Sequence, residues 1–479
     1  MRKTKIVATM GPATDDPEIL RSLIKAGLDV ARFNFSHGTH DEQTVRIENF
    51  RKVCEDSGAV VAMLADTKGP EIRLGVFAEG KVELVAGNLF TLTADDVQGD
   101  ATRASVTYEG LPHELTPGTR VLIDDGLIEL TVESITGNDI VTRILNGGPV
   151  SNRKSINIPG VKLNLPYISS TDRSDLRYIA ENGFDILAAS FVRSAEDIKE
   201  IKAELARVDS GNKIRIIAKI ENAEGIRNID SILDIADGLM VARGDLGVEV
   251  AFEELPIIQK DLISKALYRG KEVITATQML ESMINNPRPT RAETSDVANA
   301  IYDGTSAIML SGETAMGKYP VAALAAMARI AERIESSIDY RVRFIKDVHR
   351  PEKSVTNAIS HATVTAAHEM DAAAILTVTW AGTTARSTAK YRPHCPVIAC
   401  TPDPVSARQL KLEWGVVPVL MHKETDTTEL FEHALELGMR GGFFREGDLV
   451  VLSAGVPIGR AGNTNLLKVH VVGEKAFMF

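Results

Sequence analysis

The sequence contains little cysteine. Only three of its 479 residues are cysteines, Cys54, Cys395 and Cys400, and no two of them form a C-x-x-C pair. An odd number of cysteines without such a pair argues against both a disulfide framework and a zinc site. We therefore expect three reduced thiols with a structural role.

The sequence also lacks a long apolar run and a long basic run. No apolar stretch approaches the roughly 18 to 20 residues that cross a bilayer. The first ten residues, MRKTKIVATM, contain too brief an apolar segment for a signal peptide. The formal net charge of -11 makes nucleic acid and anionic membranes poor partners. We expect a cytoplasmic protein whose basic residues act locally, at anion pockets.

The composition is typical of a folded, soluble protein. Hydrophobic residues make up 44% of the chain and charged residues 25%, which does not fit a disordered chain. At roughly 150 residues per domain, the length corresponds to about three domains.

Short apolar segments alternate with helical patterns over much of the chain, and eight of them are typical of strands. This alternation predicts a (β/α)8 TIM barrel, which we assign to residues 1–69 and 161–345. In such barrels the active site lies at the carboxyl ends of the strands, where this sequence keeps its unusual polar residues. The predicted strands are residues 5–9, 29–35, 60–66, 185–190, 214–220, 238–242, 272–276 and 307–310.

Two parts of the chain break the alternation. Residues 70–160 are rich in Val, Thr, Gly and Asp and predict an inserted all-β module of the β-barrel type. Gly69-Pro70 and Pro159-Gly160 bracket it as candidate hinges, so we expect a lid. Residues 346–479 predict an open α/β domain, with a helix at 354–370 and strands at 374–379, 397–400, 416–421 and 449–453.

Lys219 and Glu221 lie two residues apart at the end of the fifth predicted strand. Their side chains should therefore point to one face and enter one pocket. Asp245 follows the next strand, so two carboxylates come from adjacent strand ends, which suits Mg2+. Lys219 would neutralise negative charge that develops during a reaction. A purely structural Lys219–Glu221 pair is the alternative.

The second strand carries an inward polar row. Arg32, Asn34 and Ser36 share one face, while Phe33 and Phe35 occupy the other. Barrel cores are mostly Val, Ile and Leu, and a buried guanidinium needs a carboxylate or phosphate partner. This favours a functional role, although a simple salt bridge from Arg32 to the third strand's Asp66 would also explain the row.

Further oxygen donors and backbone groups follow the neighbouring strands. Asp66 and Thr67 add hard oxygen ligands beside Asn34 and Ser36, which suits a weakly charged cation. Gly244 allows close backbone approach, so N–H groups there could meet a carboxylate or phosphate. Thr275 and Thr277 share one face of the seventh strand, so Thr277 could bond a substrate, although a core role is commoner for such a residue.

Taken together, these segments resemble the pyruvate kinase family, in order and over nearly the whole chain. The resemblance implies phosphoryl transfer from phosphoenolpyruvate to ADP, followed by protonation of the enolate to pyruvate. The segments are ARFNFSHG (31–38), ADTKGPEIR (65–73), KIEN (219–222), MVARGDLG (240–247), ITATQMLESM (274–283), NPRPTRAE (286–293) and MLSGETAMGKYP (309–320).

The resemblance also implies a role for each matching residue. Glu221 and Asp245 would bind Mg2+ (or Mn2+), while Arg32 and Lys219 would hold the phosphoryl group, with Lys219 also stabilising the enolate. Thr277 and the backbone of Gly244 and Asp245 would receive the substrate carboxylate, and Thr277 acting with water is the expected proton donor. The expected K+ ligands are Asn34, Ser36, Asp66 and Thr67, and the expected nucleotide-binding residues are Arg73, His37 and Lys154.

Two features of the resemblance concern regulation and dependence on cations. Glu71 stands where some family members carry Lys, which predicts dependence on a monovalent cation. In the C-terminal domain the effector residues would be Thr379, Gly382, Thr383 and Thr384, on a loop suited to phosphate. Trp380 and Thr383 stand where one or another bisphosphate-regulated member has Lys. AMP or a sugar monophosphate is therefore at least as well suited as fructose 1,6-bisphosphate, and an unoccupied surface loop is the alternative.

The family is usually tetrameric, so we expect a homotetramer in which Arg291 reaches a neighbouring subunit. Two other functions stay open at this point. A Mg2+-dependent pyruvate lyase or aldolase would use a similar metal site without needing the lid or the K+ ligands. A catalytically silent metabolite sensor would have no evident reason to keep such costly buried charges.

Overall fold

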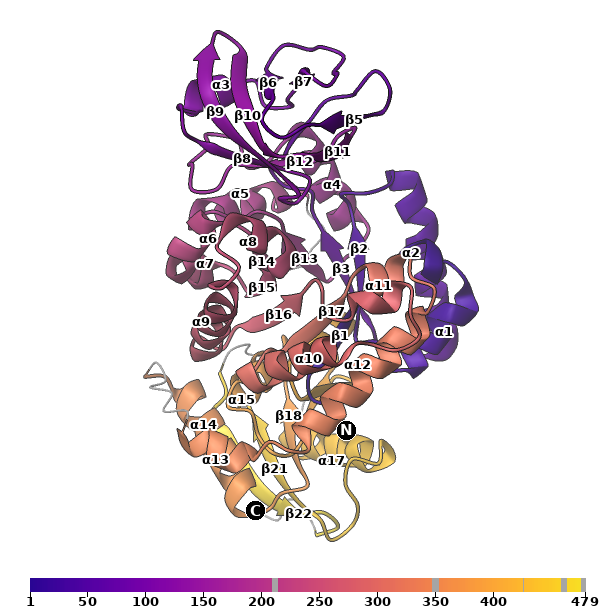
Figure 1. Cartoon of the computed structure of the whole chain (residues 1–479). Helices are drawn as coiled ribbons and strands as arrows, with labels where there is room; N and C mark the ends of the chain where they lie inside the picture. Colours follow the sequence, from indigo (N-terminus) through magenta and orange to yellow (C-terminus); the bar gives the residue numbers. More distant parts are fainter. Residues whose placement is uncertain (209–213, 347–352, 425, 458–462, 475–479) are drawn as a thin grey trace.

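The computed structural model describes residues 1–208, 214–346, 353–424, 426–457 and 463–474. Three bodies follow one another along the molecule, with the barrel between the inserted module and the C-terminal domain (Figure 1). None of the helices in these residues is long and apolar enough to cross a membrane.

The central body is the predicted barrel, and its eight strands are all parallel and close into a ring in the order β1-β17-β16-β15-β14-β13-β3-β2. Each observed strand lies within one of the predicted segments, so the fold class is confirmed. The strands are β1 (Lys5–Thr9), β2 (Val30–Asn34), β3 (Ala62–Asp66), β13 (Ile186–Ala189), β14 (Arg215–Ile220), β15 (Gly238–Ala242), β16 (Glu272–Ala276) and β17 (Ala307–Leu310).

Alternate residues of each strand face the inside of the barrel. Val7, Leu64, Ile217 and Met240 belong to one fully buried cluster that fills the interior, whereas Phe33 packs outward among other aromatic rings. Parallel strands that are buried on both faces consist of continuous apolar segments. These segments are easy to recognise, which is why the strands could be predicted well from the sequence.

Helices cover the outside of the barrel, and several begin at capping boxes. Thr39 caps α2 with Glu42, Ser169 caps α4 with Asp172, and each pair satisfies backbone N–H groups that a helix start leaves free. The helical elements are η1 (Pro12–Thr14), α1 (Pro17–Lys25), α2 (His40–Ser57), α4 (Ser170–Glu181), α5 (Ala195–Leu205), α6 (Ala223–Arg227), α7 (Ile229–Ile235), α8 (Arg243–Glu249), α9 (Leu255–Tyr268), η2 (Glu281–Ile284), α10 (Arg291–Asp303), α11 (Gly312–Ala315) and α12 (Pro320–Glu335).

The inserted module has a hydrophobic core of its own. Its main sheet has the order β4-β12-β8-β9-β10-β6-β7, and β11 pairs with β5 separately. Leu74 and Val106, each directly after one of the two edge strands of the main sheet, form an isolated bridge, so the sheet curls toward a barrel. Its elements are β4 (Ile72–Arg73), β5 (Lys81–Leu84), β6 (Leu89–Thr93), β7 (Arg103–Ser105), α3 (Leu111–Glu114), β8 (Arg120–Ile123), β9 (Ile128–Thr136), β10 (Asp139–Asn146), β11 (Gly148–Ser151) and β12 (Ser155–Asn157).

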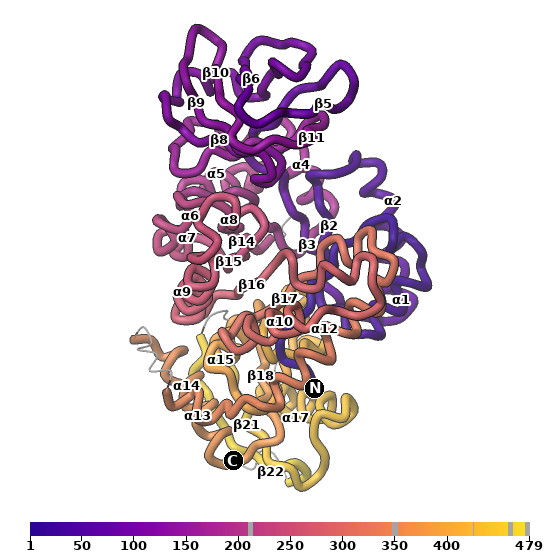
Figure 2. The backbone as a smooth tube through the Cα atoms, in the orientation of Figure 1, coloured from indigo at the N-terminus to yellow at the C-terminus, as the bar shows by residue number. Residues whose placement is uncertain are grey.

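The C-terminal domain is an open sheet in the order β20-β19-β18-β21-β22, covered by helices. Its last strand pairs antiparallel with β21 and was not predicted from the sequence. Figure 2 shows this sheet at the end of the barrel that lies away from the inserted module. The elements are α13 (Tyr340–Lys346), α14 (Val355–Glu369), β18 (Ala374–Val378), α15 (Thr383–Ala389), β19 (Val397–Thr401), α16 (Pro404–Gln409), η3 (Leu410–Leu412), β20 (Val416–Leu420), α17 (Thr427–Arg440), β21 (Leu449–Ala454) and β22 (Leu466–Val471).

Candidate active site

A buried cluster of charges lies at the carboxyl ends of the barrel strands. Lys219 Nζ is 2.9 Å from Oδ1 of Asp66 and 2.9 Å from Oε1 of Glu221. The side chains of all three residues are nearly inaccessible to solvent. The two-residue spacing therefore does bring together the side chains of Lys219, in β14, and Glu221, directly after it, and β3 brings Asp66 to them across the barrel.

Arg32 joins the same cluster from β2. Its Nε donates to Oδ2 of Asp66 at 2.7 Å, and its Nη1 donates to the hydroxyl of Thr9 at 2.8 Å. The salt bridge considered as the alternative role of Arg32 is therefore present. It orients the guanidinium beside Lys219, so that two cations converge on one buried carboxylate.

Burial and the neighbouring charges shift the pKa values of this cluster in different directions. Burial raises the pKa of Glu221 to about 7, against the influence of Lys219 and with the help of Asp245. Burial likewise raises the pKa of Asp245. For Asp66 burial acts in the same sense, but Arg32 and Lys219 outweigh it and lower the pKa. For Lys219 burial is outweighed by Asp66 and Glu221, which raise its pKa and keep it charged.

The carboxylates of Glu221 and Asp245 fit a divalent cation. Burial is the main cause of both raised pKa values and Lys219 offsets it only in part, and Asp245 makes no side-chain hydrogen bond or ion pair within the described part of the chain. In those residues no group of three acidic, His or Cys side chains could hold a metal ion by itself. The fit is thus to an ion such as Mg2+, which takes one or two carboxylates and completes its shell with substrate oxygens and water.

The four residues predicted to bind K+ also lie together. Asn34 and Asp66 are direct partners across the β2–β3 pair, Thr67 follows Asp66, and Ser36 lies in the turn after β2. The Asn34 Oδ1 accepts the Ser36 backbone N–H at 3.1 Å. These residues offer uncharged oxygens beside one carboxylate, which suits a hard monovalent cation.

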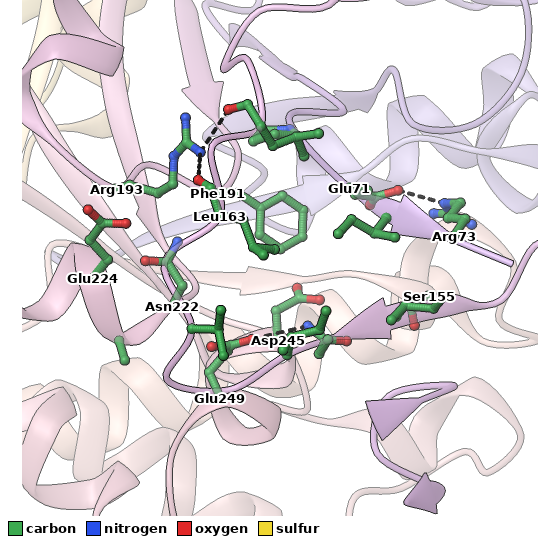
Figure 3. A pocket seen from close by; sticks show the side chains of 18 of the residues that line it. Glu71, Arg73, Ser155, Leu163, Phe191, Arg193, Asn222, Glu224, Asp245 and Glu249 are labelled. Carbon is green, nitrogen blue, oxygen red and sulfur yellow. Dashed lines mark hydrogen bonds and ion pairs between the residues drawn. The ribbon is translucent and has the colours of Figure 1, made fainter. Parts of the chain in front are cut away.

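A cavity of about 370 Å3 opens between the barrel and the inserted module. It is bordered by all three predicted nucleotide-binding residues, His37, Arg73 and Lys154, and by Asp245. Figure 3 shows Arg73 directed to Glu71, and Asp245 with Glu249 on the opposite side. Arg73 Nε lies 2.6 Å from Glu71 and Lys154 Nζ lies 2.7 Å from Asp124, so both cations carry acidic partners here.

Thr277 reaches the site in a way that the strand pattern did not predict. Thr275 bonds to Thr305, on the face opposite to the inward Ile274 and Ala276. β16 ends at Ala276, and Thr277 has a left-handed backbone with φ of 67°, which is strained for a β-branched residue. Its hydroxyl accepts the Gly244 N–H at 2.8 Å, so that N–H already has a partner.

Arg243 holds this strained turn in place. Its Nη2 donates to the Thr277 carbonyl at 2.7 Å, and its Nε to the Ala276 carbonyl at 3.3 Å. A carboxylate oxygen of Asp296 lies 2.7 Å from Nη2. The guanidinium therefore braces the junction between β16 and the start of α8, where Thr277, Gly244 and Asp245 meet.

Sequence reasoning missed Ser190 and the backbone of Phe191. The Ser190 hydroxyl accepts from Lys219 Nζ at 2.6 Å and lies 3.1 Å from Oδ1 of Asp66. The Phe191 N–H donates to Oε2 of Glu221 at 2.7 Å. A polar residue at the carboxyl end of the fourth strand was the available signal for Ser190, whereas a backbone donor leaves none.

The predicted effector loop starts α15 in the C-terminal domain. Gly382 precedes this helix with a left-handed φ of 77°, and the Thr384 hydroxyl lies 2.8 Å from the Thr464 hydroxyl. Thr379 and Thr384 are buried, whereas Trp380 is 46% exposed and Lys423 Nζ lies 5.2 Å from its ring. This loop is far along the chain from the charge cluster.

Comparison with known proteins gives a consistent result for both halves of the chain. Residues 1–324 match the family model "Pyruvate kinase, barrel domain", and residues 357–470 match "Pyruvate kinase, alpha/beta domain". A pyruvate kinase of Sporosarcina psychrophila is 50% identical over 481 residues, which covers 99% of this chain and 81% of that protein. One of Geobacillus stearothermophilus is 49% identical with the same coverage. One of Clostridium acetobutylicum is 46% identical over 98% of this chain and 100% of its own length.

Proposed function

Because this chain belongs to the pyruvate kinase family and is therefore a phosphotransferase, we propose specific roles for its residues in phosphoryl transfer from phosphoenolpyruvate to ADP. The observation that carries the proposal is the contact of Lys219 with both Asp66 and Glu221, next to a cavity bordered by Asp245. Phosphoryl transfer depends mainly on positioning and on neutralising charge, and this site concentrates fixed charges.

Arg32 and Lys219 hold the transferring phosphoryl group. Both side chains are cationic and anchored, Arg32 by Asp66 and Thr9, and Lys219 by Asp66 and Ser190. An oxygen of the ADP β-phosphate forms the new bond to phosphorus as the bond to the enol oxygen breaks. Lys219 then stabilises the enolate, because a fixed and buried cation offsets developing negative charge strongly.

The nucleotide occupies the cavity between the barrel and the inserted module. Arg73, His37 and Lys154 border this cavity and supply the positive charge that ADP phosphates require. Thr277, with water, delivers the proton that turns the enolate into pyruvate, and its neighbours Gly244 and Asp245 receive the substrate carboxylate at their backbone.

Two kinds of cation complete the site. Glu221 and Asp245 hold Mg2+ or Mn2+, which when bound supplies positive charge to the phosphoryl oxygens. Asn34, Ser36, Asp66 and Thr67 hold K+. Glu71, whose carboxylate lies 2.6 Å from Arg73 Nε, brings no positive charge to the site. A monovalent cation bound from solution therefore has to supply it.

An assay of pyruvate release tests these roles. We expect turnover with phosphoenolpyruvate, ADP and Mg2+ when K+ is present, and little when a bulky organic cation replaces K+. Equal activity in both would rule out the K+ site while keeping the kinase. Binding of phosphoenolpyruvate without pyruvate release would favour a silent sensor, and carbon-carbon cleavage would favour a lyase or aldolase.

We further propose regulation by a phosphorylated small molecule at the loop formed by Thr379, Gly382, Thr383 and Thr384. Hydroxyls and a left-handed glycine before a helix suit phosphate better than they suit an apolar ligand. AMP, a sugar monophosphate and fructose 1,6-bisphosphate are the three ligands to compare in the activity assay. A response to none of them would overturn the proposal.

A homotetramer and a cytoplasmic location remain predictions. Arg291 is exposed at the first residue of α10, where it is available to a second copy of the chain. Light scattering on the purified protein measures the assembly, and a mass of one or two copies would contradict the prediction.

A further inference from the structure

The turn between β2 and α2, residues 34–38, carries three of the residues assigned above to ligands. Asn34 and Ser36 belong to the proposed K+ site, and His37 borders the nucleotide cavity. β2 ends at Asn34, and Phe35 makes the last ladder bond, to the Asp66 carbonyl. Ser36, His37 and Gly38 therefore extend beyond the sheet, and their position depends on other contacts.

Gln43, on the first turns of α2, makes such contacts. Its Nε2 donates to the Asn34 carbonyl at 3.0 Å and to the His37 carbonyl at 3.1 Å. The residue is 4% exposed, so water competes little for these bonds. One carboxamide thus bonds the backbone carbonyls at both ends of the turn, which are the groups that a neighbouring strand would otherwise bond.

Few other groups restrain the turn of residues 34–38. A cavity of about 420 Å3 lies against Phe35, Gly38, His40 and Gln43, so packed side chains do not support the turn on that side. Gly38 has a left-handed φ of 78°, which only a residue without a side chain adopts easily. The hydrogen bonds from Gln43 consequently carry much of the restraint.

The chemistry required at position 43 is specific. The carbonyls of Asn34 and His37 are both bonded by one nitrogen atom, which must therefore carry two N–H groups. A neutral amide provides them without placing a positive charge beside the K+ site. The Gln43 Oε1 is buried without a hydrogen-bond partner in the described structure, so its acceptor is unused. The part of Gln43 that matters here is therefore the pair of N–H donors on Nε2.

We propose that Gln43 is a positioning residue that sets the affinity of the site for K+ by fixing the turn of residues 34–38. The inference rests on the K+ site proposed above. Gln43 acts through Asn34 and Ser36 without touching substrate or cation itself, so its loss weakens cation binding without removing a reacting group.

The test compares Gln43→Met, Gln43→Glu and Thr44→Val with the unchanged enzyme. Gln43→Met removes both donors, and Gln43→Glu keeps the shape but offers oxygens to two carbonyls. Thr44→Val is the matched control, because Thr44 neighbours Gln43 on α2 and the change removes bonds to the His40 carbonyl and to Tyr178 of α4 without touching the turn. K+ is titrated at constant ionic strength with tetramethylammonium.

We expect the half-saturating K+ concentration to rise about tenfold in both Gln43 variants, with kcat at saturating K+ within about twofold of the unchanged enzyme. Thr44→Val keeps the original value. A second readout needs no turnover: K+ alone raises the thermal midpoint, and that titration shifts to higher concentrations in the Gln43 variants.

Three outcomes overturn the proposal. An unshifted K+ curve in Gln43→Glu and Gln43→Met removes the role of Gln43 while leaving the K+ site. An equal shift in Thr44→Val shows general loosening of α2 instead. An unchanged enzyme that responds to K+ in neither readout rules out the K+ site as well.

Discussion

The ammonium nitrogen of Lys219 lies 2.9 Å from Oε1 of Glu221, so a proposed catalytic cation and a proposed metal ligand are paired at one strand end. The pair is not isolated, because Asp66 lies equally close to Lys219. A bound divalent cation would take over part of the charge of Glu221 and leave Lys219 available to the phosphoryl group.

Replacement of Lys219 by methionine should remove catalysis while keeping the shape of the side chain. We expect kcat to fall by about 10²- to 10³-fold or more, because a preorganised charge is lost where negative charge develops. Steady-state kinetics and phosphoenolpyruvate binding measure the effect. Lys199→Met, at an exposed ion pair with Glu196, is the control, and an equal loss there would contradict the assigned role.

Mg2+ binding should depend on pH because burial raises the pKa of Glu221 to about 7. The cation requires the ionised carboxylate, so affinity should weaken below pH 7 by up to about tenfold per unit and level off above it. Calorimetry in buffers of different ionisation enthalpy should detect proton release near neutral pH. Binding that is constant from pH 6 to pH 8, with no proton released, would show that Glu221 is already ionised or is not a ligand.

The sequence predicted those members of the charge cluster whose positions follow from the alternation of side chains along a strand. Lys219 and Glu221 share a face because strand side chains alternate, and the apolar runs located all eight barrel strands. Thr277 could not be placed by this reasoning, since its left-handed backbone breaks the alternation. β22 was missed because its residues, LLKVHV, are only partly buried at the edge of the sheet.

The Thr277 hydroxyl should matter more than the shape of its side chain. Thr277→Val keeps the volume but removes the acceptor for the Gly244 N–H and the proposed proton donor, so kcat/KM for phosphoenolpyruvate should fall at least about 100-fold. Thr277→Ser retains the hydroxyl and should stay within about fivefold of the unchanged enzyme. Equal activity of the two variants would mean that the hydroxyl has no part in the reaction.

Two buried carboxyls at the junction of the barrel and the C-terminal domain should behave differently. Glu272 lies 2.5 Å from Arg215, which outweighs burial and lowers the pKa of Glu272 to about 2. Burial and the Glu272 charge raise the pKa of Glu413 well above its usual value, against the influence of Arg386 3.1 Å away, so we expect Glu413 to be protonated at pH 7. Glu413→Gln should therefore be nearly neutral for stability at pH 7.

Glu272→Gln should instead destabilise the protein by about 3 to 5 kcal/mol, because the buried Arg215 loses the carboxylate 2.5 Å away and is left with that of Asp237 at 4.0 Å. A carboxyl with a lowered pKa stabilises the fold above the unfolded value of 4.5 and loses that effect as the pH falls toward about 2. The deficit should thus be fully present at pH 7. Chemical denaturation measures both variants, and equal losses would contradict the assigned protonation states.

Arg193 should restrain residues 161–166, the segment that follows the candidate hinge Pro159-Gly160 and leads back into the barrel; we call this segment the hinge. Its Nη1 donates to the Leu165 carbonyl at 2.9 Å and, more weakly, to the Leu163 carbonyl at 3.4 Å (Figure 3). Phe191, two residues earlier, donates its backbone N–H to Glu221, so one short loop contacts both the hinge and a proposed metal ligand. A module that moves as a lid would transmit its position through this loop.

Arg193→Gln removes the charge and shortens the reach of the side chain. Amide hydrogen exchange of residues 161–166 should become faster, since bonds that hold this segment are lost. The KM for ADP should rise about three- to tenfold, because closure of the inserted module over the nucleotide must then order residues 161–166, which are more mobile in the variant. Arg173→Gln, which loses an ion pair with Glu204 on α5 but no hinge contact, is the control. Unchanged exchange in residues 161–166 would show that the hinge is held elsewhere, and a larger KM without faster exchange would place Arg193 at the nucleotide itself.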